Sequence, residues 1–119
     1  MITWFTGNSG AGKTTIASKR HGILLDGDEL RAVWPGLGLD RESRWEQNRR
    51  VARLAALLGA QGYDVNVAVI APYRELRKEL DEIANINWVY VRGGRQPSAE
   101  YPYEPPLPED GYSIIEGAA

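Results

Sequence analysis

Short apolar runs alternate with longer amphipathic stretches along the whole chain. The run over residues 65–71, Val-Asn-Val-Ala-Val-Ile-Ala, is nearly continuous in apolar and β-branched residues. This pattern is typical of a central parallel strand that is buried on both faces. The apolar runs together predict five strands, at Ile2–Thr6, Ile23–Leu25, Val65–Ala71, Trp88–Val91 and Tyr112–Ile115.

The stretches between these runs predict helices. The longest covers about residues 41–60 and has Asp40 as a suitable N-cap. Its apolar residues recur at helical spacing, at Val51, Leu54, Ala55 and Leu58. Further helices are predicted at residues 13–20, within residues 26–34, and after Pro72. Strands that alternate with helices predict an α/β fold with a mostly parallel central sheet, which binds ligands at the carboxyl ends of its strands.

Residues 92–110 have no such pattern and are expected to form loops. The segment contains Gly93-Gly94 and five prolines, Pro97, Pro102, Pro105, Pro106 and Pro108. The chain has no internal repeat and no composition change that would mark a boundary. We therefore expect residues 1–119 to form one domain with a loop-rich, proline-rich tail.

The strongest motif follows the first predicted strand. Residues 7–14 match G-x-x-x-x-G-K-[ST] in full. Its glycines let the backbone N–H groups face phosphate oxygens, and the helix that opens at Lys13 adds its positive end. Lys13 can reach the terminal phosphates of ATP, and the Thr14 hydroxyl can hold Mg²⁺. This motif predicts a P-loop three-layer sandwich whose nucleotide contacts are Gly7, Asn8, Ser9, Gly10, Ala11, Gly12, Lys13, Thr14 and Thr15.

Two further clusters lie near predicted strand ends. Asp26, Asp28 and Arg31 follow the second strand. A carboxylate beside a transferred phosphoryl group can accept a hydroxyl proton or hold a magnesium water, and an Arg can bind an anionic substrate. Taken alone, Asp-Gly-Asp is also an ordinary turn sequence. Five arginines crowd the longest helix; most suit a solvated face paired with Glu42 and Glu46, whereas Arg44 lies near the strand ends.

Composition restricts the alternatives. The net charge of −2 gives no global basic field, so no nucleic acid partner is expected. There is no cysteine and one histidine, His21, which excludes disulfides and thiolate metal sites. No apolar stretch is long enough for a membrane span, and the first residues do not look like a signal peptide. We expect a cytoplasmic protein with small-molecule nucleotide partners, no membrane association, and a homodimer left open.

Five blocks of sequence resemble the adenylylsulfate kinases in order and approximate spacing. The blocks are Gly7–Thr15, Leu25–Arg31, Arg44–Ala52, Ile70–Arg74 and Pro102–Pro106. Members of that family phosphorylate the 3′-hydroxyl of adenosine 5′-phosphosulfate (APS) with Mg-ATP. The resemblance therefore implies an ATP-dependent kinase with ATP and Mg²⁺ as cofactors.

The resemblance also implies roles for individual residues. Asp28 is implied as the base and as a magnesium-associated carboxylate, together with Lys13 on the phosphates and Thr14 on the metal. The residues implied at the substrate site are Asp26, Arg31, Arg44, Gln47, Ile70 and Ala71. Arg92 and Arg95 stand where the family carries a much longer lid, and we expect them to fold over the phosphates as a reduced lid. The alternative is a surface hairpin whose arginines are solvated.

The sequence departs from the family pattern at several of these blocks. Leu39 replaces the aromatic residue that stacks on the substrate adenine, Ala71 replaces Ser, Gln47 replaces Asn and Glu29 replaces Asn. Two alternative functions therefore stay open. The chain could phosphorylate another small-molecule or nucleotide hydroxyl, or it could bind nucleotide with little turnover.

Overall fold

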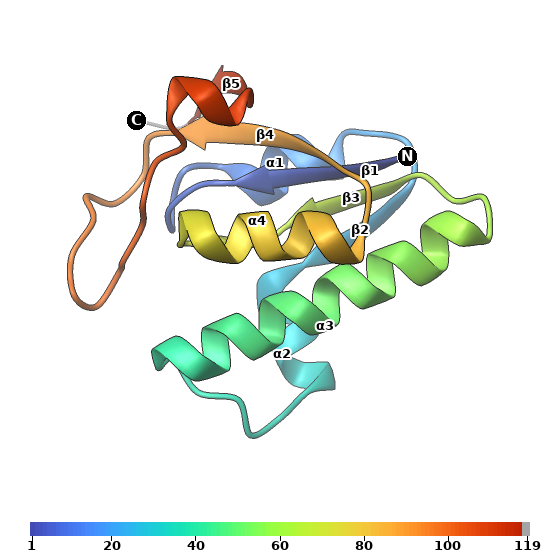
Figure 1. Ribbon diagram of the computed structural model, residues 1–119, viewed down its shortest axis with the longest axis horizontal. Coiled ribbons are helices and arrows are strands. Elements are labelled where there is room, and N and C mark those ends of the chain that lie inside the picture. Colours follow the sequence, from blue (N-terminus) through green and yellow to red (C-terminus); the bar gives the residue numbers. More distant parts are fainter. Residues whose placement is uncertain (118–119) are drawn as a thin grey trace.

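A computed structural model describes residues 1–117, and it contains a five-stranded, wholly parallel sheet (Figure 1). The strand order is β2-β3-β1-β4-β5, with β1 in the centre. The strands span Ile2–Thr6 (β1), Ile23–Asp26 (β2), Val65–Ala68 (β3), Ile86–Arg92 (β4) and Ser113–Glu116 (β5). All five predicted strands are present.

Helices cover both faces of this sheet and complete three layers. They span Lys13–Ser18 (α1), Gly27–Val33 (α2), Arg41–Ala60 (α3) and Arg74–Ile83 (α4), and a 3₁₀ turn, η1, spans Pro108–Asp110. In Figure 1, α3 and α4 lie in front of the sheet and α1 lies behind it. The predicted bounds and the predicted N-cap of α3 are confirmed, because the Asp40 carboxylate accepts a hydrogen bond from the Ser43 N–H at 3.1 Å.

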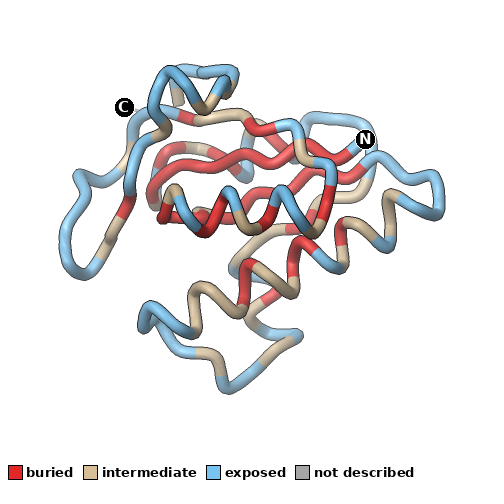
Figure 2. Tube along the Cα trace, in the orientation of Figure 1, coloured by how far each residue is buried: buried red, intermediate tan, exposed pale blue. Residues whose placement is uncertain are grey.

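The two faces of β1 form two separate cores. Trp4 is fully buried with residues of α3 and α4, and Phe5 is buried on the opposite face with Ala17 of α1. This alternation follows from the two-residue period of a strand. The buried segments in Figure 2 run through the middle strands of the sheet, and β1 and β3 among them end at the site described below.

The third strand is shorter than the sequence predicts. We expected it to reach Ala71, but it ends at Ala68. The next two carbonyls leave the β1 ladder and accept hydrogen bonds from side chains of β1, Val69 from the Trp4 indole at 3.0 Å and Ile70 from the Thr6 hydroxyl at 2.5 Å. These side-chain bonds satisfy the backbone while the chain turns away from the sheet.

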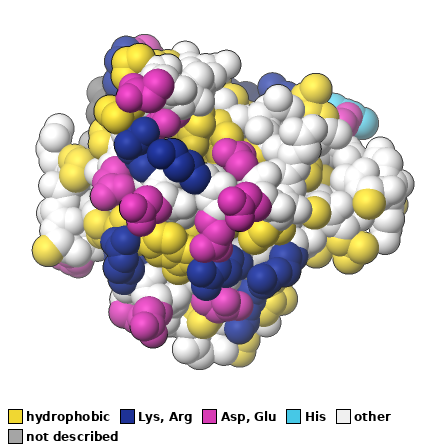
Figure 3. All heavy atoms as spheres, viewed as in Figure 1, with side chains coloured by type: hydrophobic (Ala, Val, Ile, Leu, Met, Phe, Trp, Pro, Cys, Tyr) yellow, Lys and Arg dark blue, Asp and Glu magenta, His cyan; other side chains and the backbone are white. Residues whose placement is uncertain are grey.

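The proline-rich tail packs back against α4 and β4. The Glu104 N–H donates to the Pro72 carbonyl at 2.7 Å, and the Arg74 guanidinium makes a two-pronged ion pair with Asp110. On the face that carries α3 and α4, Lys and Arg side chains are interspersed with Asp and Glu (Figure 3). Within residues 1–117, none of the helices combines the length and apolar character that a bilayer crossing requires.

Candidate active site

A cavity of about 390 Å³ opens at the carboxyl ends of β1, β2 and β3. Its walls come from the loop between β1 and α1, the start of α2, the first turns of α3, residues 68–72 and residues 100–102. Parallel sheets bind ligands at this edge because the loops and helix N-termini converge there. The structure therefore brings the phosphate loop and the predicted acceptor residues to one pocket.

The phosphate loop wraps from β1 into α1. Gly10 and Gly12 have φ values of 82° and 97°, in the left-handed region that favours glycine. Lys13 is largely buried, and its Nζ donates to the Asn8 carbonyl at 3.0 Å. The lysine thus points back along the loop, whose backbone N–H groups would face the phosphates.

Burial lowers the pKa of Lys13 to about 8, and the nearby Asp26 and Asp28 carboxylates offset part of that shift. Both acidic groups therefore lie within electrostatic range of the lysine ammonium. The pocket holds one cation and two carboxylates around the place where a terminal phosphate would lie.

Asp26 and Asp28 differ in what they contact. The Thr14 hydroxyl donates to Asp26 Oδ1 at 2.6 Å, while Asp26 Oδ2 caps α2 by accepting from the Glu29 N–H at 3.2 Å. Asp28 lies one residue into α2 and lines the pocket. Within residues 1–117, no hydrogen bond donor contacts its carboxylate. The structure thus gives Thr14 a different carboxylate neighbour from the one implied by resemblance.

A hydroxyl next to a carboxylate suits Mg²⁺, which prefers oxygen ligands and keeps several waters and phosphate oxygens in its shell. Within residues 1–117, no cluster of three or more His, Cys, Asp or Glu side chains could hold a metal ion. Thr14 and Asp26 are therefore the residues that fit a magnesium ion bound mainly through its nucleotide.

The predicted acceptor residues line the side of the pocket that α2 and α3 form. Arg31 donates to the Gly38 carbonyl at 3.3 Å, and Arg44 donates to the Glu100 carbonyl at 3.1 Å. Gln47 is buried and donates to the Gly27 carbonyl at 3.2 Å, which fixes the start of α2 against α3. Neither arginine has a carboxylate partner within residues 1–117, so both forks can still bind an anion.

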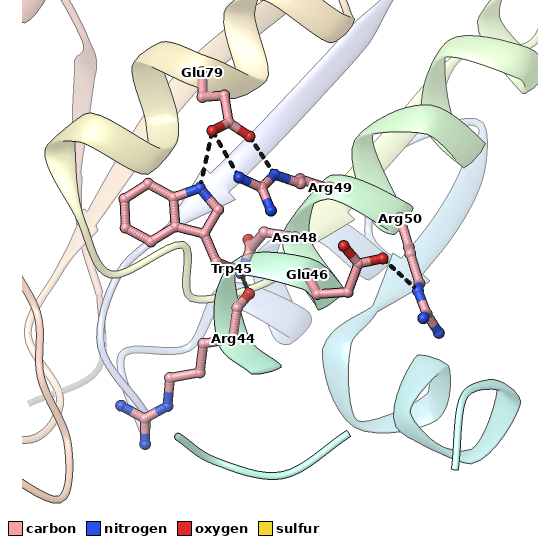
Figure 4. A network of polar contacts seen from close by, with 7 residues as sticks. All are labelled: Arg44, Trp45, Glu46, Asn48, Arg49, Arg50 and Glu79. Carbon is pink, nitrogen blue, oxygen red and sulfur yellow. Dashed lines mark hydrogen bonds and ion pairs between the residues drawn. The ribbon is translucent and has the colours of Figure 1, made fainter. Parts of the chain in front are cut away.

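Two other arginines of α3 have carboxylate partners (Figure 4). Arg49 pairs with Glu79 of α4, and Arg50 pairs with Glu46 one turn earlier. The expected pairing within α3 is therefore found for Glu46. Arg44 points away from this network, on the side of the helix that faces the pocket.

Ile70 and Ala71 line the pocket beside β1. Ala71 is fully buried and has a φ of 48°, which is uncommon for a residue with a Cβ atom. Its carbonyl accepts from the buried Arg77 guanidinium at 2.7 Å, and the same guanidinium donates to the Glu104 carbonyl at 2.6 Å. Arg77 thus ties the pocket wall to the tail.

Arg92 and Arg95 do not line the pocket. The Arg92 guanidinium pairs with Glu116, its register partner on β5. The Arg95 guanidinium lies 4.3 Å from the centre of the Tyr101 ring. Both side chains that were predicted to form the lid therefore lie outside the pocket. The backbone of the segment that carries them lies against the pocket.

Several lining residues had no assigned site role in the sequence. Glu100, Tyr101 and Pro102 enter the pocket from the tail, and Asn48 enters from α3. Asn48 is buried, and its Oδ1 has no hydrogen bond partner within residues 1–117, while its Nδ2 donates to the Arg44 carbonyl at 2.7 Å. The available signal was that Asn48 lies in the third block of the resemblance, and that Glu100 and Tyr101 directly precede the last block, which begins at Pro102.

Comparison with known proteins agrees with this geometry. The family model for adenylylsulphate kinase matches residues 1–96. The chain belongs to the adenylylsulphate kinase family. The predicted resemblance and the predicted P-loop α/β fold are both confirmed.

Individual members of the family show the extent of the similarity. The adenylyl-sulfate kinase of Chloroflexus aurantiacus is 35% identical over 143 positions, which cover 92% of this chain and 77% of the relative. That of Pseudomonas aeruginosa is 43% identical and covers 76% of this chain but only 53% of the relative. The Mycobacterium tuberculosis APS kinase, solved in complex with AMPPNP and APS, is 30% identical with a TM-score of 0.71, covering 76% of this chain and 61% of that one.

The lengths of these matches show that at least one relative is longer within the aligned region. The aligned span with the Chloroflexus relative, 143 positions, is longer than the 119 residues of this chain. That relative therefore has internal segments that this member of the family lacks. In the structure, 20 residues, 93–112, connect β4 to β5.

Proposed function

We propose that this protein transfers the γ-phosphoryl group of ATP to the 3′-hydroxyl of APS. The observation that carries the proposal is one pocket that combines three parts: the phosphate loop, the Asp28 carboxylate, which has no hydrogen bond donor within residues 1–117, and two arginine forks at Arg31 and Arg44. A kinase needs these three parts: a phosphate clamp, a proton acceptor, and a site for the anionic acceptor.

The transfer step follows from these positions. The acceptor 3′-oxygen attacks the γ-phosphorus, the bond from that phosphorus to the bridging oxygen of ADP breaks, and the Asp28 carboxylate takes the hydroxyl proton. Lys13 and the loop N–H groups balance the negative charge on the phosphate oxygens. ADP leaves with the electron pair of the broken bond.

We propose that Thr14 and Asp26 hold Mg²⁺, with Asp28 near enough to contact its waters. The ion would supply positive charge against the β- and γ-phosphate oxygens. The proposal is supported by the 2.6 Å contact between Thr14 and Asp26, which places a hydroxyl and a carboxylate side by side at the phosphate loop.

We propose that Arg31, Arg44 and Gln47 surround the acceptor, with Ile70 and Ala71 as the opposite wall. APS carries a phosphate and a sulfate group, and a planar guanidinium binds such anions in two-pronged geometry. The product of this reaction belongs to sulfate assimilation, and ATP supply favours the cytoplasm. A homodimer stays a prediction.

A kinase for a different hydroxyl acceptor is the second candidate. The observation in its favour is Leu39, which lines the pocket and is 65% exposed, where the family carries an aromatic residue. An aliphatic side chain offers an adenine ring less stacking area than an aromatic side chain does.

An acceptor panel separates the two candidates. We expect phosphate transfer from γ-labelled ATP to APS to exceed transfer to sugars, nucleosides and nucleoside monophosphates. Faster transfer to one of those acceptors would favour the second candidate. ATP hydrolysis without transfer to any acceptor would favour a nucleotide-binding protein with little turnover.

A further inference from the structure

We propose that Asn8 is a positioning residue that anchors residues 93–101, here called the strap, as a fixed wall of the acceptor pocket. The inference rests on the proposed function for its kinetic consequence but on geometry alone for the anchoring. The strap leaves β4, crosses the phosphate loop and reaches α3. In Figure 1 the strap is part of the long orange loop beside the carboxyl end of the sheet.

The Asn8 side chain bonds both ends of the strap. Its Nδ2 donates to the Arg95 carbonyl at 3.1 Å and to the Tyr101 carbonyl at 3.2 Å. Its Oδ1 accepts from the Ser9 N–H at 2.9 Å, so the amide has two acceptors beside its nitrogen and a donor beside its oxygen. Asn8 is 4% exposed, and these bonds are therefore shielded from water.

The strap backbone also contacts the phosphate loop directly. The Arg95 N–H donates to the Ser9 carbonyl at 2.9 Å. A Cβ atom at Gly94 would lie 2.6 Å from the Ser9 carbonyl oxygen and 2.6 Å from the Ala11 nitrogen. This approach requires glycine, because no side chain fits between the two segments.

The far end of the strap is tied to the acceptor side. Arg44 donates to the Glu100 carbonyl, and Glu100 and Tyr101 line the pocket. Tyr101 is the one aromatic side chain in that lining within residues 1–117, and the Arg95 guanidinium stacks on its ring. The strap thus places Tyr101 where a nucleotide acceptor would enter.

Asn8 also connects the strap to the phosphate clamp, since its own carbonyl accepts from Lys13 Nζ. Loss of the side-chain amide would free the strap while leaving the loop backbone in place. The pocket would then lose its acceptor-side wall and admit water, which competes with the acceptor for the γ-phosphoryl group.

The test compares Asn8→Leu and Gly94→Ala in the full chain. Both changes weaken the contact between the phosphate loop and the strap, Asn8→Leu from the side of the loop and Gly94→Ala from the side of the strap. Gly111→Ala is the matched control, because Gly111 has a φ of 74°, close to the 77° of Gly94, but a Cβ atom added there would meet no atom within 4 Å. Trypsin cleavage after Arg95 reports strap opening without any need for activity.

We expect both variants to be cleaved after Arg95 about tenfold faster than the wild type, because each hydrogen bond lost shifts the opening equilibrium severalfold. Cleavage at other arginines and in Gly111→Ala should stay at the wild-type rate. With Mg-ATP and APS, the acceptor KM should rise at least about fivefold more than the ATP KM, and ATP consumed per APS phosphorylated should rise above one.

Wild-type cleavage after Arg95 in Asn8→Leu would overturn the inference. It would also be overturned by faster cleavage along the whole chain with equal rises in both KM values, since that pattern indicates general destabilisation. If the wild type transfers no phosphate to APS, the proposed function fails, while the cleavage rates still decide whether Asn8 anchors the strap.

Discussion

The Thr14 hydroxyl lies 2.6 Å from Asp26 Oδ1, across the gap between the phosphate loop and the end of β2. The contact joins α1 to the N-cap of α2, so one carboxylate serves both the proposed metal position and the local fold. Asp28, two residues later, keeps its carboxylate free of hydrogen bond donors within residues 1–117. The two acidic residues are thus expected to have different roles.

Asp28→Asn keeps the side-chain shape and removes the proton acceptor. We expect kcat to fall by about 10²–10⁴-fold, the usual contribution of a general base. Nucleotide affinity, measured by titration with a fluorescent ATP analogue, should change little.

Asp26→Asn should behave differently, because Asp26 contacts Thr14 and caps α2. We expect it to raise the Mg²⁺ concentration needed for half-maximal activity and to lower the thermal stability. A near-normal Asp28→Asn beside an Asp26→Asn without measurable kcat would show that the roles are reversed.

Lys13→Ala removes the buried cation that we propose binds the terminal phosphates. We expect kcat/KM for ATP to fall at least about tenfold, since charge stabilisation is the main catalytic device of phosphoryl transfer. Lys19→Ala, at the exposed end of α1, is the matched control and should stay near wild type. Unchanged ATP affinity and turnover in Lys13→Ala would contradict the assigned role.

Arg31→Lys and Arg44→Lys retain the charge but lose the planar fork. We expect the acceptor KM to rise about tenfold while the ATP KM stays within about twofold, because one two-pronged contact with an anion is lost. Arg53→Lys, on the exposed side of α3, is the control. An equal rise in both KM values would indicate a general electrostatic or folding effect.

Asp110→Asn breaks the ion pair that fastens the tail to the start of α4. The Arg74 guanidinium lowers the pKa of Asp110 to about 2, from an ordinary value of 3.8. A lowered carboxyl pKa stabilises the fold above pH 3.8 and loses this effect as the pH falls towards 2. Urea unfolding should show a loss of about 1 kcal/mol at pH 7, an amount suited to an ion pair that remains partly exposed to solvent.

The pH dependence is the check on that assignment. The difference in the free energy of unfolding between Asp110→Asn and the wild type should shrink steadily between pH 4 and pH 2. A difference that stays constant over this range would mean that Asp110 acts through packing instead of charge.

Local patterns predicted most of the fold because they depend on neighbouring residues. The phosphate loop, the five strands and α3 with its Asp40 cap all follow from short-range spacing. The end of β3 could not be predicted, because the Val69 and Ile70 carbonyls are satisfied by side chains some 65 residues away in the sequence.

Contacts between residues far apart in the sequence also explain why the lid prediction was wrong for the Arg92 and Arg95 side chains. The sequence predicted that Arg92 and Arg95 would fold over the phosphates, but their side chains lie outside the pocket, because their partners depend on the strand register and on the tail. Arg92 meets Glu116 because β4 and β5 are parallel neighbours, and Asn8 meets the strap across 87 residues. Such long-range contacts leave no periodic signal in the sequence.

The central claim is ATP-dependent phosphorylation of APS, and it is tested most directly by resolving the products of one reaction. The chain is incubated with Mg²⁺, γ-labelled ATP and APS, and the nucleotides are separated and counted. We predict labelled 3′-phosphorylated APS in a one-to-one ratio with ADP, and loss of that product in Asp28→Asn. Labelled inorganic phosphate as the sole product, or transfer to APS unaffected by Asp28→Asn, would contradict the account.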